Sequence, residues 1–462
     1  MKPTVVILAA GLGTRMKSGI AKALHPVAGM PLVRHVLKAA ADLDPEKTIL
    51  VLGHQADKVR NAAGSHGVEI VLQVEQLGTG HAVMQAREAF SEARGPVVIL
   101  CADTPLLTGG TLRAALELHR KSRAAVTLIT AALADPFGYG RVVRNRGGVM
   151  RVVEEKDATA AQKKIKEVNA GIYCFDRQFL LASLDLLDKD NAQGEYYLPD
   201  TIELAKKKKR AVAALVCGDP DEVMGVNSRY DLSRAEQVMR RRINRRWMAE
   251  GVTLFDPEST FVGIEASLGR DVVIYPNVRI EGKTKIGDAC MIYPGSRIID
   301  STISNAVLVK DCSVIEESDI ASGASIGPFA HLRPGSVIGA DARIGNFVEI
   351  KKSTIGAGSK ANHLSYIGDA TVGRDVNIGA GVITCNYDGY EKYRTVIEDG
   401  VFVGSDAQLV APVTIGKGAL VAAGTTITRD VPADALAISR VPQDIREGFA
   451  SRRRRMKQKR KK

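Results

Sequence analysis

Residues 325–351 read SIGPFAHLRPGSVIGADARIGNFVEIK, and this stretch decides the fold of the second half of the chain. An aliphatic residue stands at every sixth position: Ile326, Leu332, Ile338, Ile344 and Ile350. A period of six fits neither an amphipathic helix nor a heptad, but it is typical of the hexapeptide repeat of a parallel β-helix. One aliphatic side chain per hexapeptide would point into a triangular core, and the glycine that often follows it would allow the turn at the corner. Three hexapeptides make one coil, so roughly 18 residues bring the chain back to the same face about 4.8 Å further along the axis.

The same period continues on both sides of this stretch. Before it, the aliphatic positions are Val262, Leu268, Ile274, Ile280, Ile286, Ile292 and Ile298, followed by Leu308, Val314 and Ile320. After it, five-residue steps lead to Ile355 and Val372, and the series runs on through Ile367 and Ile378, followed by Ile397, Val403, Leu409, Ile415, Val421 and Ile427. We therefore expect a left-handed parallel β-helix of hexapeptide repeats over residues 251–445.

The first half alternates short apolar runs with helical segments. The runs of strand type are Val5–Ala10, Thr48–Leu52, Glu69–Val74 and Val97–Leu100, and helical segments lie between them at Leu32–Ala41 and Ala82–Phe90. This alternation predicts a Rossmann-like α/β domain with a mostly parallel sheet. A longer amphipathic segment that ends before Gly251 predicts a helix between the domains. The predicted division is an α/β domain at 1–227, a linker helix at 228–250, the β-helix at 251–445 and a basic tail at 446–462.

Length and composition agree with two domains. The 462 residues exceed what one hydrophobic core usually supports. No apolar run is long enough to span a membrane, and Val5–Ala10 is too short for a signal peptide. The six cysteines are scattered without a Cys-x-x-Cys pair, which argues against a disulfide framework or a zinc site. We therefore expect a protein of the reducing cytoplasm.

The net charge of +12 depends on the C-terminus. Nine of the 64 basic residues lie in Arg452–Lys462, which leaves 55 basic against 52 acidic residues elsewhere. A nucleic-acid-binding protein usually carries its basic residues on a folded surface with aromatic residues among them, so no nucleic-acid partner is expected. We interpret the tail as a disordered, solvated end.

The first strand ends in a glycine loop, Leu8-Ala9-Ala10-Gly11-Leu12-Gly13-Thr14-Arg15-Met16. Met16 stands where a dinucleotide fingerprint has its third glycine, and the Gly-Lys-Ser/Thr of a Walker A loop is absent. Glycines at the carboxyl edge of a parallel sheet expose backbone N–H groups to ligands. Arg15 and Lys22 would add positive charge around a polyphosphate. A plain tight turn explains the glycines equally well.

Asp103 follows another strand, in Cys101-Ala102-Asp103-Thr104-Pro105, and should lie at the same edge of the sheet. Mg²⁺ is typically bound through one or two carboxylates and the phosphates of a substrate. An aspartate facing a glycine loop, with Arg15 and Lys22 nearby, meets that requirement. The alternative is an aspartate that caps a turn before Pro105.

Two cations should stack on the β-helix. Arg333 and Lys351 are 18 residues apart in an unbroken register, so their backbones should lie about 5 Å apart on adjacent coils. At an effective dielectric constant near 20, two such charges repel by roughly 3 kcal/mol. An anion between them would turn repulsion into attraction, and one coil further Tyr366 comes near the same column. This column predicts a phosphate pocket, with chance surface charges as the alternative.

Two more features lie near this column. The repeat breaks over Cys385–Arg394 and restarts at Ile397, and a polar excursion of this kind indicates a loop that forms a site. His363 lies in Lys360-Ala361-Asn362-His363-Leu364-Ser365-Tyr366. An imidazole with a pKa near 6.5 can take a proton from an attacking amine, although a lone histidine is more often structural.

Taken together, these motifs resemble the sugar-phosphate nucleotidyltransferase family. The resemblance rests on Leu8–Met16, Lys22, Gln76–Ala82, the Asp103 turn and Asn169–Gly171. With a β-helix that holds Asn386-Tyr387-Asp388-Gly389, all of the chain except the tail resembles the bacterial bifunctional N-acetylglucosamine-1-phosphate uridylyltransferase/glucosamine-1-phosphate N-acetyltransferase family. The resemblance implies that glucosamine 1-phosphate is acetylated with acetyl-CoA. Uridylyl transfer from UTP would then give pyrophosphate and UDP-N-acetylglucosamine for peptidoglycan and lipopolysaccharide precursors.

The resemblance also implies roles for individual residues. UTP and the UDP-sugar would be held by Leu8, Ala9, Ala10, Gly11, Arg15, Lys22, Gln73, Gly78, Thr79, Gly140, Glu154, Asn169 and Asn227, with Mg²⁺ on Asp103 and Asn227. The sugar phosphate of the acetyltransferase site would be held by Arg333, Lys351, Tyr366, Asn377 and Lys392, with His363 as general base. Acetyl-CoA would contact Ala380, Asn386, Tyr387, Ser405, Ala423 and Arg440. A homotrimer formed through the β-helix, with these sites between subunits, is implied as well. Ala102 and Asn362 stand where the family often has glycine.

Two other functions stay open. The chain could be a pyrophosphorylase with one activity whose β-helix is regulatory, although His363 and the loop at 385–394 argue against this. It could instead be a β-helix scaffold without activity, which would leave Arg15, Lys22 and Asp103 without a use.

Overall fold

The computed structural model describes residues 1–64, 67–146 and 148–460. The chain forms two compact units. One comprises Met1–Arg245 with Val262–Ile264, and the other Arg246–Phe261 with Glu265–Lys462. None of the helices in these described ranges is long and apolar enough to cross a membrane.

The first unit is built on a central sheet of nine strands in its described residues, seven of them in the order β11-β7-β10-β6-β1-β4-β5. These strands are β1 (Thr4–Ala9), β4 (Lys47–Leu52), β5 (Val68–Leu72), β6 (Val97–Cys101), β7 (Val126–Ala132), β10 (Glu167–Phe175) and β11 (Val212–Val216). The neighbours β1, β4, β5 and β6 are parallel, whereas β10 runs antiparallel to β6 and β7. The hairpin of β8 (Arg141–Asn145) and β9 (Gly148–Val153) pairs with β10.

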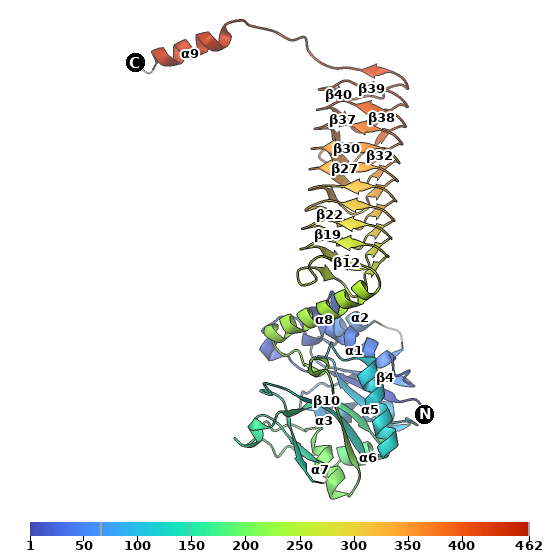
Figure 1. Ribbon diagram of the computed structural model, residues 1–462, viewed down its shortest axis with the longest axis vertical. Coiled ribbons are helices and arrows are strands. Elements are labelled where there is room, and N and C mark those ends of the chain that lie inside the picture. The colour runs from blue at the N-terminus through green and yellow to red at the C-terminus, as the bar shows by residue number, and fades with distance from the viewer. Residues whose placement is uncertain (65–66, 147, 461–462) are drawn as a thin grey trace. The chain divides into compact units, whose positions relative to one another are not determined.

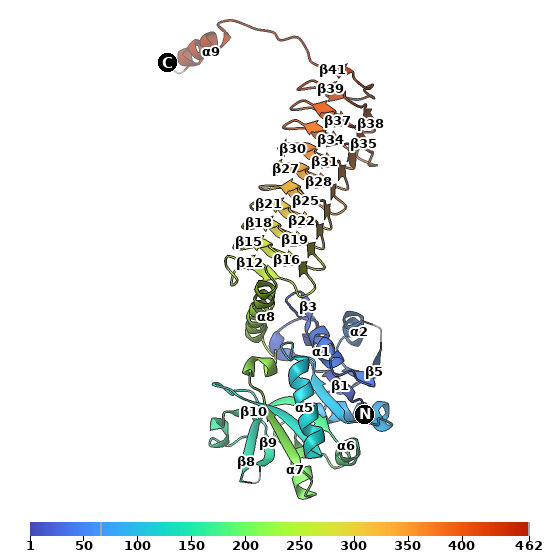
Figure 2. The ribbon, with the colours of Figure 1, turned by 45° about the vertical axis from the view of Figure 1, so that its right-hand side comes forward.

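Both faces of this sheet are covered by helices, which explains why β1 is an unbroken apolar run. Val5 and Ile7 pack in a cluster with α1 (Leu32–Ala41) and α5 (Gly109–Ser122), which lie together on one face (Figure 2). Val6 packs on the opposite face with α3 (Thr79–Gln85), α4 (Arg87–Ser91), α6 (Arg177–Leu184) and α7 (Asp200–Lys207). The short helix α2 (Ala56–Ala63) follows β4.

The four predicted strands correspond to β1, β4, β5 and β6, and the predicted helix at Leu32–Ala41 is α1. The single helix predicted at Ala82–Phe90 is wrong in detail, because α3 and α4 meet there at Ala86. The break is local: the N–H of Ala86 bonds to the carbonyls of Val83 and Met84 in a tightened last turn.

In the described part of the second unit, three parallel sheets of 11, 10 and 9 strands form a β-helix, drawn as stacked coils in Figure 1. The sheets run from β12 (Thr253–Leu254) to β41 (Leu436–Ala437), from β13 (Phe261–Val262) to β40 (Thr426–Ile427) and from β14 (Ser267–Leu268) to β38 (Val413–Ile415). Each strand pairs with the strand one coil later, as Leu332 pairs with Ile350. The predicted fold class, an α/β domain followed by a left-handed parallel β-helix, is confirmed.

The aliphatic positions of the quoted stretch point into the core, and all five are buried. Leu308 and Val314 were expected to do the same, and that register is wrong. Val309 and Ile315 are fully buried instead, because Ile292 pairs with Val309 and Ile298 with Ile315. The coil is one residue short here, with a five-residue step from Ile298 to the buried Ile303.

The predicted linker helix is present as α8 (Arg229–Ala249). Ala235, Met239, Ile243 and Trp247 are buried along it. Gly251 follows with φ 96°, a left-handed conformation suited to glycine after a helix end. The division of the chain at residues 227 and 250 stays a prediction.

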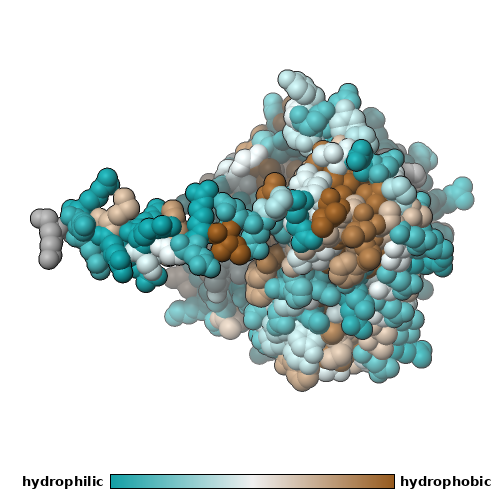
Figure 3. Space-filling model, turned by 90° about the horizontal axis from the view of Figure 1, so that it is seen from above, coloured by the Kyte–Doolittle hydropathy of each residue, from teal (hydrophilic) through white to brown (hydrophobic). Residues whose placement is uncertain are grey.

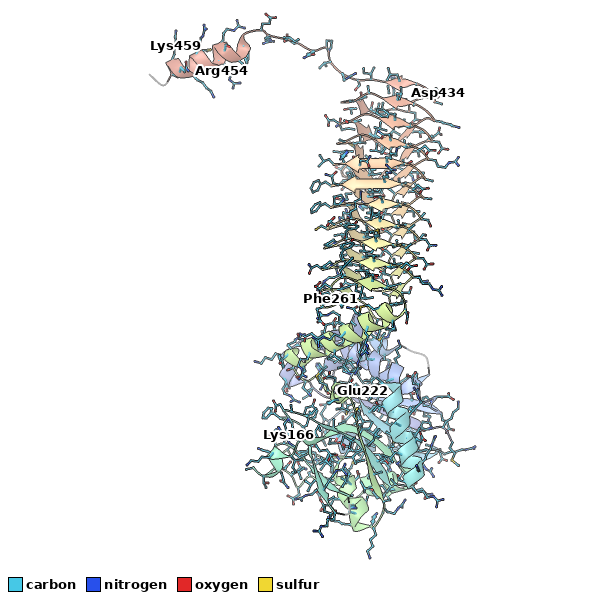
Figure 4. All side chains as sticks on the ribbon, in the orientation of Figure 1. Lys166, Glu222, Phe261, Asp434, Arg454 and Lys459 are labelled. Atoms are coloured by element: carbon cyan, nitrogen blue, oxygen red, sulfur yellow. The ribbon has the colours of Figure 1, made fainter. Side chains whose placement is uncertain are left out.

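The C-terminal segment differs from the expected disorder, because α9 spans Phe449–Lys459. Arginine, lysine, methionine and glutamine are good helix formers, so this sequence becomes helical without burying any residue. Figure 3 shows the segment as mainly hydrophilic, and in Figure 4 the labelled side chains of Arg454 and Lys459 extend away from the helix. The last two residues of the predicted tail, Lys461 and Lys462, lie outside the described residues.

Candidate active sites

A cavity of about 400 Å³ opens where β1 and β6 end. It adjoins a second cavity of about 260 Å³, and both are lined by Leu8, Thr79, Cys101 and Asp103. The first also contains the predicted Ala9, Ala10, Gly11, Lys22, Gln73 and Gly78, and the second the predicted Gly140, Glu154, Asn169 and Asn227. The structure thus brings together residues from nine separate stretches of the first unit.

Positive side chains meet the two predicted metal ligands in this space. The Lys22 ammonium bonds to the Asp103 carboxylate and, at 3.0 Å, to Oδ1 of Asn227. Arg15 lies outside both linings, but its guanidinium donates to the same Asn227 oxygen at 2.8 Å. The Asp103 carboxylate and the Asn227 amide oxygen therefore both contact the Lys22 ammonium. Oxygen donors of these two kinds also suit Mg²⁺. Across the described ranges, no group of three or more His, Cys, Asp or Glu side chains could hold a metal ion. A metal at this pair would need further oxygens, from water or from substrate phosphates, to complete its coordination.

The second cavity is acidic. Burial, followed by the charges of Asp200, Asp157 and Glu195, raises the pKa of Glu154 to about 7. Burial also raises the pKa of Asp200 to about 6. Near neutral pH the Glu154 carboxyl can therefore either donate or accept a hydrogen bond. A side chain at Gly140 would collide with it, since a Cβ there would come 2.9 Å from Oε1 of Glu154.

Tyrosines, which the sequence did not single out, support this end of the site. The Asn169 amide donates to the Tyr173 hydroxyl at 2.7 Å, and the backbone N–H of Gly225 donates to the Tyr139 hydroxyl at 3.2 Å. Both tyrosines line the second cavity. The first contact lies within β10, where the register is irregular between these two residues. The second joins residues 86 positions apart in the chain, so no local spacing in the sequence indicates it.

Cys101 and Ala102 precede the aspartate, at a position where the resemblance implies a less bulky residue. Ala102 is buried, and its N–H donates to the carbonyl of Leu8, so the extra methyl group lies within the lining. Burial raises the pKa of the Cys101 thiol to about 12. The thiol therefore stays protonated at neutral pH, and it faces the carbonyl of Gly171 at 3.5 Å.

The cation column of the β-helix is present, but its charges are arranged differently from the prediction. Arg333 lies next to Lys351 across the coils, since Leu332 pairs with Ile350 and the Arg333 N–H bonds to the Ile350 carbonyl. Its guanidinium, however, donates to Glu349 at 2.8 Å. The positive charge of Arg333 is thus already paired with the Glu349 carboxylate.

The cation that faces Lys351 is Lys392, from the loop at 385–394. Lys351 lowers the pKa of Lys392 through a side-chain contact and charge repulsion, while Asp369 acts in the opposite direction. The charge repulsion expected between Arg333 and Lys351 therefore acts between Lys351 and Lys392 instead. The sequence pattern missed it because Lys392 lies outside the repeat.

Tyr366 reaches the column from a neighbouring position. In β28 (Glu349–Lys351) and β31 (Tyr366–Gly368), Tyr366 pairs with Glu349, and Gly368 pairs with Lys351. A side chain at Gly368 would overlap the Tyr366 hydroxyl. The glycine therefore leaves room for the tyrosine ring beside Lys351. Asn377 lies on another sheet, in β33 (Asn377–Ile378), paired with Lys360.

His363 is exposed at the end of β30 (Lys360–His363), where it pairs with Asn346 of β27 (Arg343–Asn346). Nδ1 of the ring lies 2.9 Å from Oδ1 of Asn346. Because an amide oxygen only accepts, Nδ1 carries the hydrogen and Nε2 keeps its lone pair. Asn346 thus fixes the tautomer that a base needs. Asn362, which precedes His363, packs its carbonyl against Gly345.

The predicted acetyl-CoA residues fall into two groups. Ala380, Ser405 and Ala423 lie at corners of successive coils, where the Asp406 N–H bonds to Ala380 and the Gly424 N–H to Ser405; the Arg440 side chain lies beside Gly424. Asn386 and Tyr387 belong to the loop at 385–394. The Asn386 amide donates to Asp369, and the Asp388 carboxylate accepts the N–H groups of Tyr390 and Glu391. The loop is therefore an ordered structure on the side of the β-helix.

Comparisons with known proteins agree with this architecture. Residues 5–166 match the MobA-like NTP transferase domain, and residues 265–300, 317–352 and 394–429 match the bacterial transferase hexapeptide family of six repeats. The bifunctional protein GlmU of Halalkalibacterium halodurans is 52% identical over 449 residues, which cover 97% of this chain and 98% of that protein. The proteins of the same name from Pelobacter propionicus and Geobacillus thermodenitrificans are each 51% identical. The first match covers 97% of this chain and the second 98%, and each covers 98% of the relative.

A nucleotidyltransferase cavity, a separate site on a hexapeptide β-helix and identity over almost the full length lead to one conclusion. The chain belongs to the family of the bifunctional protein GlmU, whose two domains carry the uridylyltransferase and the glucosamine-1-phosphate acetyltransferase activities.

Proposed function

We propose that the two linked cavities of the first unit bind UTP and N-acetylglucosamine 1-phosphate side by side. Leu8–Gly11, Gln73, Gly78 and Thr79 would hold the nucleotide, and Gly140, Glu154 and Asn169 the sugar. The observation that carries this assignment is the cation contact between Lys22, Asp103 and Asn227 at the junction of the cavities. Mg²⁺ held by Asp103 and Asn227 would neutralise phosphate charge.

In this reaction an oxygen of the sugar phosphate attacks the α-phosphorus of UTP. The new P–O bond forms as the bond to the β-phosphate bridge breaks, and pyrophosphate leaves. Arg15 and Lys22 would stabilise the negative charge that develops on the phosphates, which is the main contribution that such chemistry asks of a protein. Lys22 would have to move from Asp103 toward the nucleotide to do so.

For the acetyltransferase site we propose that Lys351 and Lys392 hold the phosphate of glucosamine 1-phosphate, together with Arg333, Tyr366 and Asn377. The support is the contact between the two lysines, because an anion placed there would relieve their repulsion. The sugar amine attacks the thioester carbonyl carbon of acetyl-CoA. Nε2 of His363 takes the proton from the amine, and the coenzyme A thiolate leaves and is protonated. Ala380, Asn386, Tyr387, Ser405, Ala423 and Arg440 would bind acetyl-CoA.

The assembly and setting belong to the same proposal. We propose a homotrimer formed through the β-helix, with acetyltransferase sites between subunits, in the cytoplasm. The free state of all six cysteines supports a reducing compartment. The functional division would follow residues 1–227, 228–250, 251–445 and 446–462. Light scattering of the purified chain tests the trimer.

Two substitutions test the separation of the sites. Asp103→Ala should abolish pyrophosphate release while coenzyme A release continues, and His363→Ala should do the reverse. Omitting UTP, acetyl-CoA, glucosamine 1-phosphate or Mg²⁺ in turn separates this proposal from an enzyme with a single activity. Loss of both activities in one folded variant would contradict the assignment of two sites.

Lys351→Ala tests the phosphate pocket. A charge-assisted contact contributes about 1.5–3 kcal/mol, so KM for glucosamine 1-phosphate should rise by one to two orders of magnitude. Free glucosamine should be a poor substrate of the unmodified enzyme. Equal turnover of the free and the phosphorylated sugar would remove the basis for this pocket.

A further inference from the structure

Gln73 follows β5 and is almost fully buried in the lining of the first cavity. Its amide nitrogen lies 3.2 Å from the carbonyl oxygen of Gly78 and 3.0 Å from Nδ1 of His81. An amide nitrogen has two hydrogens and no acceptor, so these two contacts use both of them. Within the described residues, Oε1 is then the one polar side-chain atom of Gln73 left for a ligand in the cavity.

The Gly78 carbonyl fixes the direction of this amide, because a carbonyl only accepts. Gly78 has φ 103°, and a Cβ on it would come 2.6 Å from the Tyr196 carbonyl oxygen. The adjoining N–H groups are also bonded: Tyr196 donates to Leu77 at 2.9 Å, and Gly80 donates to Tyr196 at 2.8 Å. The backbone around the acceptor is thus held in place from both sides.

His81 supplies the second acceptor, from α3. Because the Gln73 nitrogen can only donate, Nδ1 of His81 must carry a lone pair, and the ring hydrogen is then on Nε2. Nε2 lies 3.1 Å from the amide nitrogen of the exposed Gln85, so that amide has to turn and offer its oxygen as the acceptor. The ring is stacked on Tyr196, with centroids 6.2 Å apart and an interplanar angle of 23°. If the Gln73 amide were reversed, Oε1 would face two acceptors at once, the Gly78 carbonyl and the His81 lone pair.

We propose that His81 is a positioning residue that sets the base preference of the uridylyltransferase. By holding the Gln73 amide with Oε1 toward the cavity, it makes the site favour a pyrimidine whose N3 carries a hydrogen, such as uracil. Cytosine presents a lone pair at N3, which would meet another acceptor. A site built to accept one hydrogen bond rejects a ligand that cannot donate it. This inference rests on the proposed function, because it assumes that Gln73 contacts the base.

The test compares UTP with CTP as substrates of the full-length enzyme with N-acetylglucosamine 1-phosphate and Mg²⁺. His81→Leu removes the Nδ1 acceptor and replaces the ring with an apolar side chain of similar size. His81→Asn can place Oδ1 where Nδ1 stood. Gln85→Ala is the matched control, because Gln85 also contacts the His81 ring, at Nε2, but is exposed and lines neither cavity. Gln73→Ala tests the base contact itself.

His81→Leu should lower kcat/KM for UTP about tenfold, the order of one lost hydrogen bond, and change that for CTP by less than twofold. The change should appear in KM, since the base lies away from the reacting phosphorus. His81→Asn and Gln85→Ala should keep the UTP/CTP ratio within about twofold of the unmodified enzyme. Competition binding of UDP against CDP gives the same comparison without turnover.

An equal loss for UTP and CTP in His81→Leu would mean a purely structural role and overturn the inference. Failure of the proposed function looks different: Gln73→Ala would then leave the UTP/CTP ratio unchanged. If Gln73→Ala alters the ratio and His81→Leu does not, Gln73 contacts the base but His81 does not position it. Thermal unfolding of each variant and its acetyltransferase activity identify any variant that has lost its fold.

Discussion

At the scale of single residues, function in this chain depends on which partner each polar side chain already has. Lys22 bonds to both predicted metal ligands, and Asn346 leaves a lone pair on the exposed nitrogen of His363. Arg333 is paired with Glu349, whereas Lys351 faces another cation. These pairings decide which groups can still bind a substrate.

Glu154 should make the first unit less stable as pH rises. A carboxyl whose pKa is raised to about 7 by folding, from 4.5, stabilises the folded state below the unfolded pKa. That contribution is lost as pH rises through 7. Glu154→Gln lacks this titration. Between pH 4.5 and 7.5 its free energy of unfolding should therefore rise relative to that of the parent by on the order of 1–3 kcal/mol, and its melting temperature should rise with it. Thermal unfolding followed across this range, with the exposed Glu92→Gln as control, measures the effect; parallel curves would contradict it.

Lys22 should compete with metal ions for Asp103 and Asn227. Lys22→Met removes the ammonium from between the two oxygens while roughly keeping the length of the side chain, so Mn²⁺ should bind more tightly in the absence of nucleotide. Paramagnetic resonance titration of Mn²⁺ measures this binding directly. Uridylyl transfer should fall in the same variant, because a phosphate contact is lost.

Lys17→Met is a matched control, since Lys17 is an exposed residue of the same segment. The double variant Lys22→Met/Asp103→Ala should lose the gain in Mn²⁺ binding. If Mn²⁺ affinity is the same with and without Lys22, the ammonium does not occupy the metal position.

At the scale of elements, the β-helix works because each short strand repeats the position of the strand below it. Asn346 pairs with His363, and Gly368 follows Lys351 in the same column, so the register of the coils brings together residues of the proposed acetyltransferase site. Glycines are required where a corner of one coil touches the next.

Gly345 is one such glycine. A methyl group on it would overlap the carbonyl oxygen of Asn362 in the next coil. Gly345→Ala should therefore destabilise the β-helix by several kcal/mol and abolish acetyl transfer, because backbone atoms must move. Gly400→Ala is the comparison: it has φ 67° with no atom within 4 Å of its Cβ, so only backbone strain of about 1 kcal/mol is expected. Equal melting temperatures for both variants would show that the coil contact is tolerant.

The hexapeptide period predicted the β-helix, since one aliphatic residue per turn is a local signal. It did not predict the short coil, because Leu308-Val309 and Val314-Ile315 are each two adjacent aliphatic residues, and either register places an apolar side chain inside. The glycine loop, Asp103 and the column of Arg333 and Lys351 were predicted from position and spacing in the sequence, and the other candidate site residues came mainly from the resemblance. The contacts of His81 with Gln73 and of Lys392 with Lys351 depend on side chains that meet across loops, and no spacing in the chain encodes them. Asn346 lies one coil of 17 residues before His363, so the register of the coils does indicate that contact.

At the scale of the whole molecule, the chain joins two catalytic units and ends in a basic helix that buries nothing. Coenzyme A carries several phosphate charges, so a polycation near the thioester site would speed its capture, an effect that fades as salt rises. The alternative is a tail that only improves solubility.

Truncation after Ala450 should leave uridylyl transfer unchanged and weaken the use of acetyl-CoA only at low ionic strength. Replacing Arg452–Arg455 with glutamine removes four charges while keeping good helix formers, which separates charge from helix. Acetyl transfer measured at about 20 and 300 mM salt spans weak to strong screening. Identical constants for the full-length and truncated chains at both salts would leave the tail without a catalytic role.

The stacking of coils also determines how the β-helix comes apart. Each coil is held only by its neighbours, and among the described residues β40 and β41 end their sheets with a strand partner on one side alone. Amide hydrogens in these last strands should exchange with deuterium before those of the middle coils, as the open end frays and closes. Ala423 and Arg440 lie in this fraying region, so bound acetyl-CoA should slow exchange there first. Bound acetyl-CoA would then stabilise the open end of the β-helix, where no further coil of the described chain covers the last strands.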